Sequence, residues 1–164
     1  ILHTGHRPDA VQDLIQNVFS TDQIPRPAIR KQYWSEGLET GDEYVAMWSK
    51  QGARESVAIV DKVGDSAHVS DIFRRDSLPK GSSGKMIASV LREVGLTQPP
   101  TIRITKIQDD QPTLGQIDAG TSIGATILGG VLIKTASELG GVPTGWSSGT
   151  DMRGKRWIEV TISY

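Results

Sequence analysis

The sequence has no cysteine among its 164 residues. This excludes disulfides, thiolate metal sites and cysteine nucleophiles, but it does not identify a compartment, because cytosolic proteins and delivered domains can both lack cysteine. The sequence also has no large excess of positive or negative charge. The 18 Lys and Arg residues are balanced by 19 Asp and Glu residues, which gives a formal net charge of −1. A strongly basic nucleic-acid-binding domain is therefore not indicated, although a local basic patch fits this balance.

Long hydrophobic runs are absent as well. No apolar stretch approaches the roughly 18 residues that a transmembrane helix needs, and the first residues lack the charged and then apolar pattern of a signal peptide. The chain does not begin with Met, so we expect either a domain within a longer polypeptide or a chain trimmed by a protease. We expect one domain over residues 1–164, with 1–7 as a frayed boundary segment.

The first half of the chain predicts a helix followed by a meander of three strands. Apolar residues at helical spacing favour a helix over 8–20, and two prolines favour a loop over 20–32. Strands are predicted at 43–49, 55–62 and 67–74. Gly52 and Gly64 stand at the hairpin positions between these strands.

The second half predicts two helices and two strands. A helix at about 83–94 is expected to be capped by Ser82 or Ser83 and ended by Gly95. The remaining elements are a strand at 101–107, a turn at 109–112, a helix at 121–139, a loop at 140–154 and a strand at 156–164. The helical crossover into strand 101–107 favours parallel pairing. We therefore predict an α+β fold with a central mixed, mostly antiparallel sheet and helices on both faces.

A small-residue loop opens the first of these two helices. Its residues are Lys80, Gly81, Ser82, Ser83, Gly84 and Lys85. The first amides of a helix have no intrahelical partner and carry the positive end of the helix dipole, so this loop suits a phosphate or pyrophosphate group. The alternative is a tight turn with a helix cap and no ligand.

The order of these elements resembles the Gcn5-related N-acetyltransferase (GNAT) fold. That family has a Gln/Arg-x-x-Gly-x-Gly/Ala loop. In KGSSGKM, Gly84 takes the last small position, whereas Ser82 and Pro79 depart from the other two. The resemblance implies an N-acyltransferase that holds acetyl-coenzyme A at this loop, or a related fold that has lost the cofactor.

An acyltransferase needs a route for one proton. Thr105, Asp109 and Tyr164 are the candidates, although Asp109 also fits a turn before Pro112 and Tyr164 also fits an anchoring aromatic residue. The residues that could bind the second substrate are Thr113, Trp146 and Ser147.

The segment LPKGSSGKMIASVLREVG, followed by PPTIRITKI, resembles the carboxy-terminal effector domains of bacterial polymorphic and contact-dependent toxins. This resemblance implies a domain that is delivered as part of a larger secreted or cell-surface polypeptide and acts in the bacterial cytoplasm. It also implies action on tRNA or another RNA, and a cognate immunity protein as partner. An acyltransferase of this kind could itself be a toxin that modifies aminoacyl-tRNA.

A metal-independent ribonuclease is the first expectation for such an effector, and a small ribonuclease-toxin architecture is the alternative fold. His68 is the candidate acid or base, and it also fits a hydrogen-bonded strand histidine. The predicted phosphate-binding cations are Arg74, Arg75, Arg103 and Lys106, together with the two loop lysines. No metal-ligand spacing occurs in the sequence, so no metal is expected. A binding module without catalysis is the third interpretation.

Overall fold

The computed structural model describes residues 28–36, 39–50, 53–74, 80–105, 107 and 110–164. Its strands are β1 (Ala28–Glu36), β2 (Glu39–Lys50), β3 (Ala53–Val63), β4 (Ser66–Arg74), β5 (Thr101–Thr105), β6 (Val142–Thr150) and β7 (Arg156–Ser163). Its helices are α2 (Ser82–Glu93), α3 (Gln111–Asp118), the 3-10 turn η2 (Ile123–Ala125) and α4 (Ile127–Glu138). The helix predicted at 8–20 lies outside the described residues.

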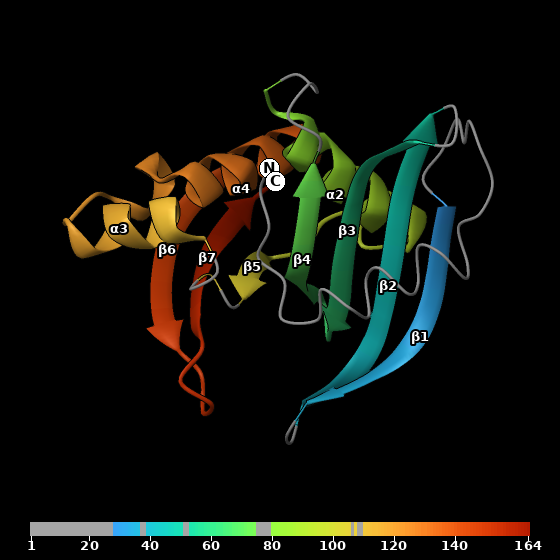
Figure 1. The fold of residues 1–164 in the computed structure, drawn as a ribbon, viewed down its shortest axis with the longest axis horizontal. Helices are drawn as coiled ribbons and strands as arrows, with labels where there is room; N and C mark the ends of the chain where they lie inside the picture. The colour runs from blue at the N-terminus through green and yellow to red at the C-terminus, as the bar shows by residue number, and fades with distance from the viewer. Residues whose placement is uncertain (1–27, 37–38, 51–52, 75–79, 106, 108–109) are drawn as a thin grey trace.

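The seven described strands form one sheet in the order β1-β2-β3-β4-β5-β7-β6. Figure 1 shows β1 to β4 side by side in one half of the sheet and β6 and β7 in the other, with β5 between the halves. β4 and β5 are parallel, and every other neighbouring pair is antiparallel. The predicted α+β class with a mixed, mostly antiparallel sheet is confirmed, as is the parallel crossover.

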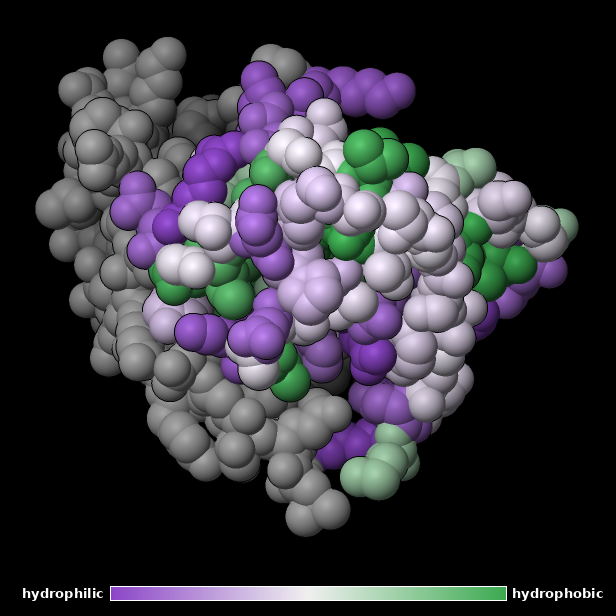
Figure 2. Space-filling view, turned by 180° about the vertical axis from the view of Figure 1, so that it is seen from behind, coloured by the Kyte–Doolittle hydropathy of each residue, from purple (hydrophilic) through white to green (hydrophobic). Residues whose placement is uncertain are grey.

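One face of the sheet and the two longer helices share a hydrophobic core. Alternate residues of the central strands point to this face, because side chains alternate along a strand. They include Val69 on β4, Ile104 on β5 and Ile158 on β7, and they are fully buried with α2 and α4 residues such as Leu91 and Leu132. The apolar surface of these helices is therefore mostly used inside the fold. Seen from behind, the exposed apolar atoms of the described residues form small separate patches (Figure 2).

Two strands were not predicted from the sequence. β1 begins inside the segment expected to be a loop at 20–32, and β6 occupies most of the expected loop at 140–154. β6 pairs with β7 through its backbone, and a strand at the edge of a sheet needs few apolar side chains. Packing explains why position 149 is a glycine, since a Cβ there would lie 2.5 Å from the Trp157 ring.

The helix after β5 was also placed incorrectly. The expected turn at 109–112 is the start of α3, where the Asp110 carboxylate accepts a bond of 3.0 Å from the Thr113 amide and Pro112 lies in the first turn. The helix expected at 121–139 begins only at Ile127, after η2. A Cβ on Gly129 would collide with the Ile123 carbonyl, so glycine permits this tight entry into α4.

Candidate functional site

The parallel strands β4 and β5 separate at the middle of the sheet. Within the described residues, their pairing ends at Val69 and Ile104 although β4 continues beyond this point. The register with β3 shifts at the same place, which makes Ser70 the extra residue of a β-bulge. The Thr105 hydroxyl donates to the Val69 carbonyl over 3.4 Å. β5 itself ends one residue later, at Thr105, whereas β4 runs on to Arg74.

Helix α2 follows β4 in the chain, and its N-cap residue makes no side-chain cap bond. Gly81 is its N-cap residue, in a left-handed conformation with φ of 90°, which glycine adopts without strain. The expectation that Ser82 or Ser83 caps the helix is wrong. The Ser83 hydroxyl is buried, with 3% of the residue exposed, and finds no hydrogen-bond partner among the described residues. The start of α2 therefore carries the positive end of a helix dipole, and its N-cap residue contributes no side chain there.

The start of α4 is capped by side chains. The amides of Ile127, Leu128 and Gly129 donate to the Gln116 Oε1 (2.9 Å), the Thr113 Oγ1 (3.2 Å) and the Thr126 Oγ1 (3.0 Å), respectively. These contacts satisfy donors that would otherwise lack an intrahelical partner. Of the two helix starts, the one at α2 is therefore the one suited to an external anion.

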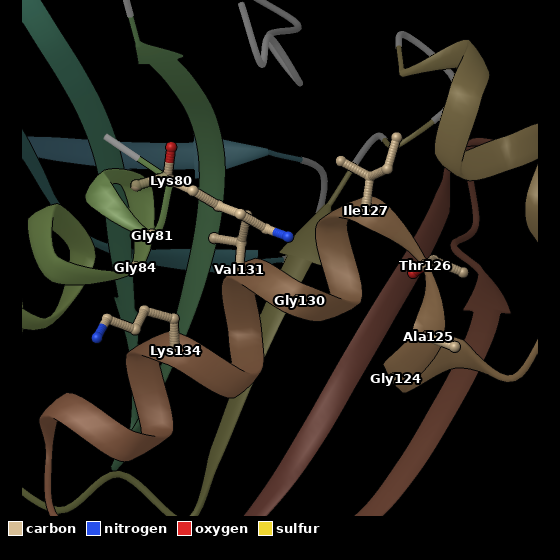
Figure 3. A pocket seen from close by; sticks show the side chains of 11 residues that line it. Lys80, Gly81, Gly84, Gly124, Ala125, Thr126, Ile127, Gly130, Val131 and Lys134 are labelled. Atoms are coloured by element: carbon tan, nitrogen blue, oxygen red, sulfur yellow. The ribbon is translucent and has the colours of Figure 1, made fainter. Parts of the chain in front are cut away.

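Both helix starts border one cavity of about 680 Å³, which we call the α2–α4 cavity (Figure 3). It is lined by Lys80, Gly81, Ser83, Gly84, Gly124, Ala125, Thr126, Ile127, Gly130, Val131 and Lys134. This volume lies in the range of small-molecule sites, about 300–1,000 Å³. Its only charged lining residues among those described are two lysines, and the Lys80 side chain extends toward Val131 across the cavity. The Lys80 charge and a helix start whose N-cap residue has no side chain favour an anionic ligand.

The two helices that border the cavity are packed closely together. A Cβ on Gly84 would lie 2.6 Å from the Lys134 side chain and 3.0 Å from the Thr135 backbone nitrogen. Arg92 donates to the Glu138 carbonyl over 2.6 Å, and the Lys134 ammonium group lies 3.1 Å from the Glu138 carboxylate. A hydrogen bond from Lys134 is the main cause that lowers the pKa of Glu138. Gly84 is thus required by helix packing, whether or not a ligand touches it.

The predicted candidates His68 and Arg103 lie together, but on the other face of the sheet. They are neighbours across β4 and β5, and their positions alternate with the core residues of those strands. The Arg103 guanidinium donates to Glu159 over 2.9 Å and lies 3.7 Å from the centre of the Trp157 ring. Burial, and then the charge of Arg103, lower the pKa of His68 to about 4. His68 is therefore neutral at pH 7, and Arg103 already has two partners.

Several other candidates are held by the fold away from the cavity. Thr113 is fully buried and its hydroxyl accepts the Leu128 amide. The Tyr164 hydroxyl donates to the Pro99 carbonyl over 2.8 Å, and burial raises its pKa. Its ring lies beside Gly141, just after the end of α4 that is distant from the cavity.

Trp146 and Ser147 lie on β6, not in a loop. Trp146 packs behind the cavity wall, because a Cβ on Gly124 would be 3.0 Å from its indole ring. Ser147 is exposed and pairs with Glu159 in the ladder. Arg75, Lys106 and Asp109 are outside the described residues, and Arg74 is described only as the last residue of β4.

Four of the predicted loop residues line the cavity: Lys80, Gly81, Ser83 and Gly84. Ser82 and Lys85 do not line it, and Lys85 is exposed. The opposite wall was not predicted from the sequence. It consists of the start of α4 with Ile127, Gly130 and Lys134. The available signal was a helix with two adjacent glycines and a lysine one turn later.

No family model matches this chain, and no curated protein matches it. Among the described residues, no helix is long and apolar enough to cross a membrane. In that same part of the chain, no three His, Asp or Glu side chains are grouped closely enough to hold a metal ion.

Proposed function

We propose that this chain binds an acyl-coenzyme A in the α2–α4 cavity and transfers the acyl group to an acceptor. The observation that carries the proposal is the start of α2, whose N-cap residue Gly81 has no side chain and which borders this cavity beside Lys80. Such a place stabilises phosphate groups through backbone amides, the helix dipole and a lysine charge.

The topology supports the same proposal. The antiparallel strands β2 to β4, the parallel step from β4 to β5 and the crossover helix follow the element order that led us to compare the chain with the GNAT fold; β1 is an additional strand that this comparison did not include. The proposed GNAT-like identity rests on this order and on the cavity, since the loop keeps only Gly84 of the family's pattern.

In this mechanism the main role of the protein is to bind acyl-coenzyme A and to orient its acyl group. The α2 amides and Lys80 would hold the phosphates, and the α4 wall would direct the remainder of the ligand. Bound acyl-coenzyme A would supply an acyl group activated as a thioester. The Thr105 hydroxyl would keep β4 and β5 joined next to the acyl group through its bond to the Val69 carbonyl.

The ribonuclease alternative has less support, because Arg103 is engaged by Glu159 and Trp157 and because the His68 pKa is low. Action on tRNA, delivery into a bacterial cytoplasm as a toxin and a cognate immunity protein stay predictions. Each of them is compatible with an acyltransferase.

The test is thermal unfolding with and without coenzyme A. A ligand at 100 times its dissociation constant adds about 2.7 kcal/mol, which raises the midpoint of a domain this size by about 5–10 °C. Lys80→Ala should reduce this shift, and Lys155→Ala, an exposed residue of the β6–β7 turn, should leave it unchanged. A wild-type midpoint that stays constant in saturating coenzyme A would refute the proposal.

A further inference from the structure

β6 is an edge strand that carries no charge. Figure 1 shows it at one side of the described sheet, with β1 at the other. An edge strand leaves backbone donors and acceptors open to another chain, and charged residues are the usual protection against such pairing. The β1 sequence contains Arg30, Lys31 and Glu36, whereas β6 has no charged residue from Val142 to Thr150. The β6 edge therefore lacks this protection.

The hydrogen-bonding pattern of the β6–β7 hairpin shows which backbone groups of β6 point to the open edge. The Asp151 amide donates to the Lys155 carbonyl over 2.8 Å, and bonding to the neighbouring strand alternates along an antiparallel pair. The register shift at the beginning of β6 lies before residues 145–150, so the alternation continues through them. Trp146 and Ser148 therefore direct their amides and carbonyls away from β7.

Two exposed apolar residues flank the centre of β6. Met152, in the turn after the strand, is 85% exposed, and Val142 is 64% exposed, the two largest values for large apolar residues among those described. Both are equally far from Ser147 in the sequence. If two antiparallel copies of β6 pair with Ser147 opposite Ser147, Trp146 of each copy lies opposite Ser148 of the other. The same register brings Val142 of each copy to the position of Met152 of the other.

We infer that β6 is the interface of a homodimer, in which a second copy of this chain extends the sheet across a twofold axis at Ser147. A twofold interface must be self-complementary. β6 meets this requirement, because no like charges face each other along it. An acidic or basic peptide would find no opposite charge on β6, so a second copy fits this edge better. The inference does not depend on the ligand of the α2–α4 cavity.

Sedimentation equilibrium of the full chain over a range of concentrations tests for the dimer. The mass should rise from the 17.8 kDa of one chain toward twice this value. Ser147→Lys should stay at the mass of one chain, since two ammonium groups would meet at the twofold axis. Within one chain the new lysine would lie beside Glu159 of β7, so the fold should tolerate it.

Thr161→Lys is the matched control for this measurement. It adds the same charge at an exposed position on the same face of the sheet, but on β7, which is an inner strand. It should form the dimer like the wild type. Thermal unfolding of both lysine variants shows that they fold.

The register is tested by cysteine cross-linking, which is specific because the chain has no cysteine. Ser147→Cys should form a disulfide between two copies on oxidation. Residues directly opposite each other in a non-hydrogen-bonded pair have Cα atoms about 4.5 Å apart, which is within the range of a disulfide. Thr161→Cys should not cross-link. Because cysteine is close to serine in size, Ser147→Cys keeps the inference testable if Ser147→Lys does not fold.

Three results would overturn the inference. A wild-type mass that stays at one chain up to the highest soluble concentration would show that β6 does not bind a second copy. A dimer that persists in Ser147→Lys, with Ser147→Cys not cross-linked, would place the interface on another surface. Equal cross-linking of Thr161→Cys and Ser147→Cys would show that contact between copies is not specific to β6.

Discussion

At the scale of residues, His68 belongs to a row of polar side chains on the face of the sheet away from α2. The register aligns Asp61, His68, Arg103 and Glu159 across four adjacent strands. Asp61 is 1% exposed, and Arg103 and Glu159 are joined by their ion pair. The imidazole is largely removed from water next to the Arg103 charge, and both conditions favour its neutral form.

This environment predicts an acid-sensitive stability. The pKa of His68 falls from 6.5 to about 4 on folding, so between these values the unfolded chain binds a proton that the folded chain does not. The contribution is complete above pH 6.5 and is lost as the pH falls toward 4. Denaturant unfolding between about pH 7.5 and 4.5 covers most of this pH range. As the pH is lowered, the free energy of unfolding of His68→Gln should decrease less than that of the wild type.

His6→Gln is the control for this measurement, because it removes an imidazole from outside the described residues. It should follow the wild-type curve. Equal slopes for His68→Gln and the wild type would show that His68 titrates normally in the folded state.

At the scale of elements, Thr126 is the N-cap residue of α4. Thr126 Oγ1 accepts the Gly129 amide over 3.0 Å and donates to the Ile123 carbonyl over 2.6 Å. Thr126→Ala should destabilise the fold by about 0.5–2 kcal/mol, the usual cost of losing an N-cap. Its thermal midpoint should fall by roughly 2–4 °C for each kcal/mol.

Thr126→Ser separates the cap from the loss of a methyl group, since serine keeps the hydroxyl. We expect its midpoint to stay near that of the wild type. If Thr126→Ser falls as far as Thr126→Ala, buried volume and not capping stabilises this helix start.

The same elements show which parts of the fold the sequence could predict. The run Val57 to Val60 indicated a strand because β-branched side chains suit a sheet, and the buried stripe of α2 indicated a helix. β6 gave no such signal, because its pairing depends on the β7 backbone and its composition resembles a loop. The absence of a cap on α2 could not be predicted either, since two serines stood at the right positions.

The candidate site was predictable on one side only. The loop from Lys80 to Gly84 is continuous in the chain, and its composition alone suggests an anion. The α4 wall joins it through contacts between residues about fifty positions apart, such as Gly84 and Lys134. Contacts of this range are decided by the packing of whole helices, which local sequence patterns do not record.

At the scale of the molecule, the spacing of α2 and α4 is fixed by the protein itself. Gly84 allows direct contact with α4 near the cavity, and the bond from Arg92 to Glu138 joins the far ends of the two helices. The protein's own contacts therefore set the spacing of the two walls of the α2–α4 cavity. A ligand would enter a formed site, and neither helix would have to move first.

This rigidity has a kinetic consequence. Association with a formed site is a single bimolecular step, so the observed rate should rise linearly with ligand concentration. Trp146, which packs against Gly124 in the cavity wall, provides a fluorescence signal for stopped-flow mixing with coenzyme A. A rate that levels off at high concentration would reveal a slow conformational step. With a linear rate, the speed of capture is set by diffusion and by the charge of Lys80 in the cavity, and it should decrease as salt is added.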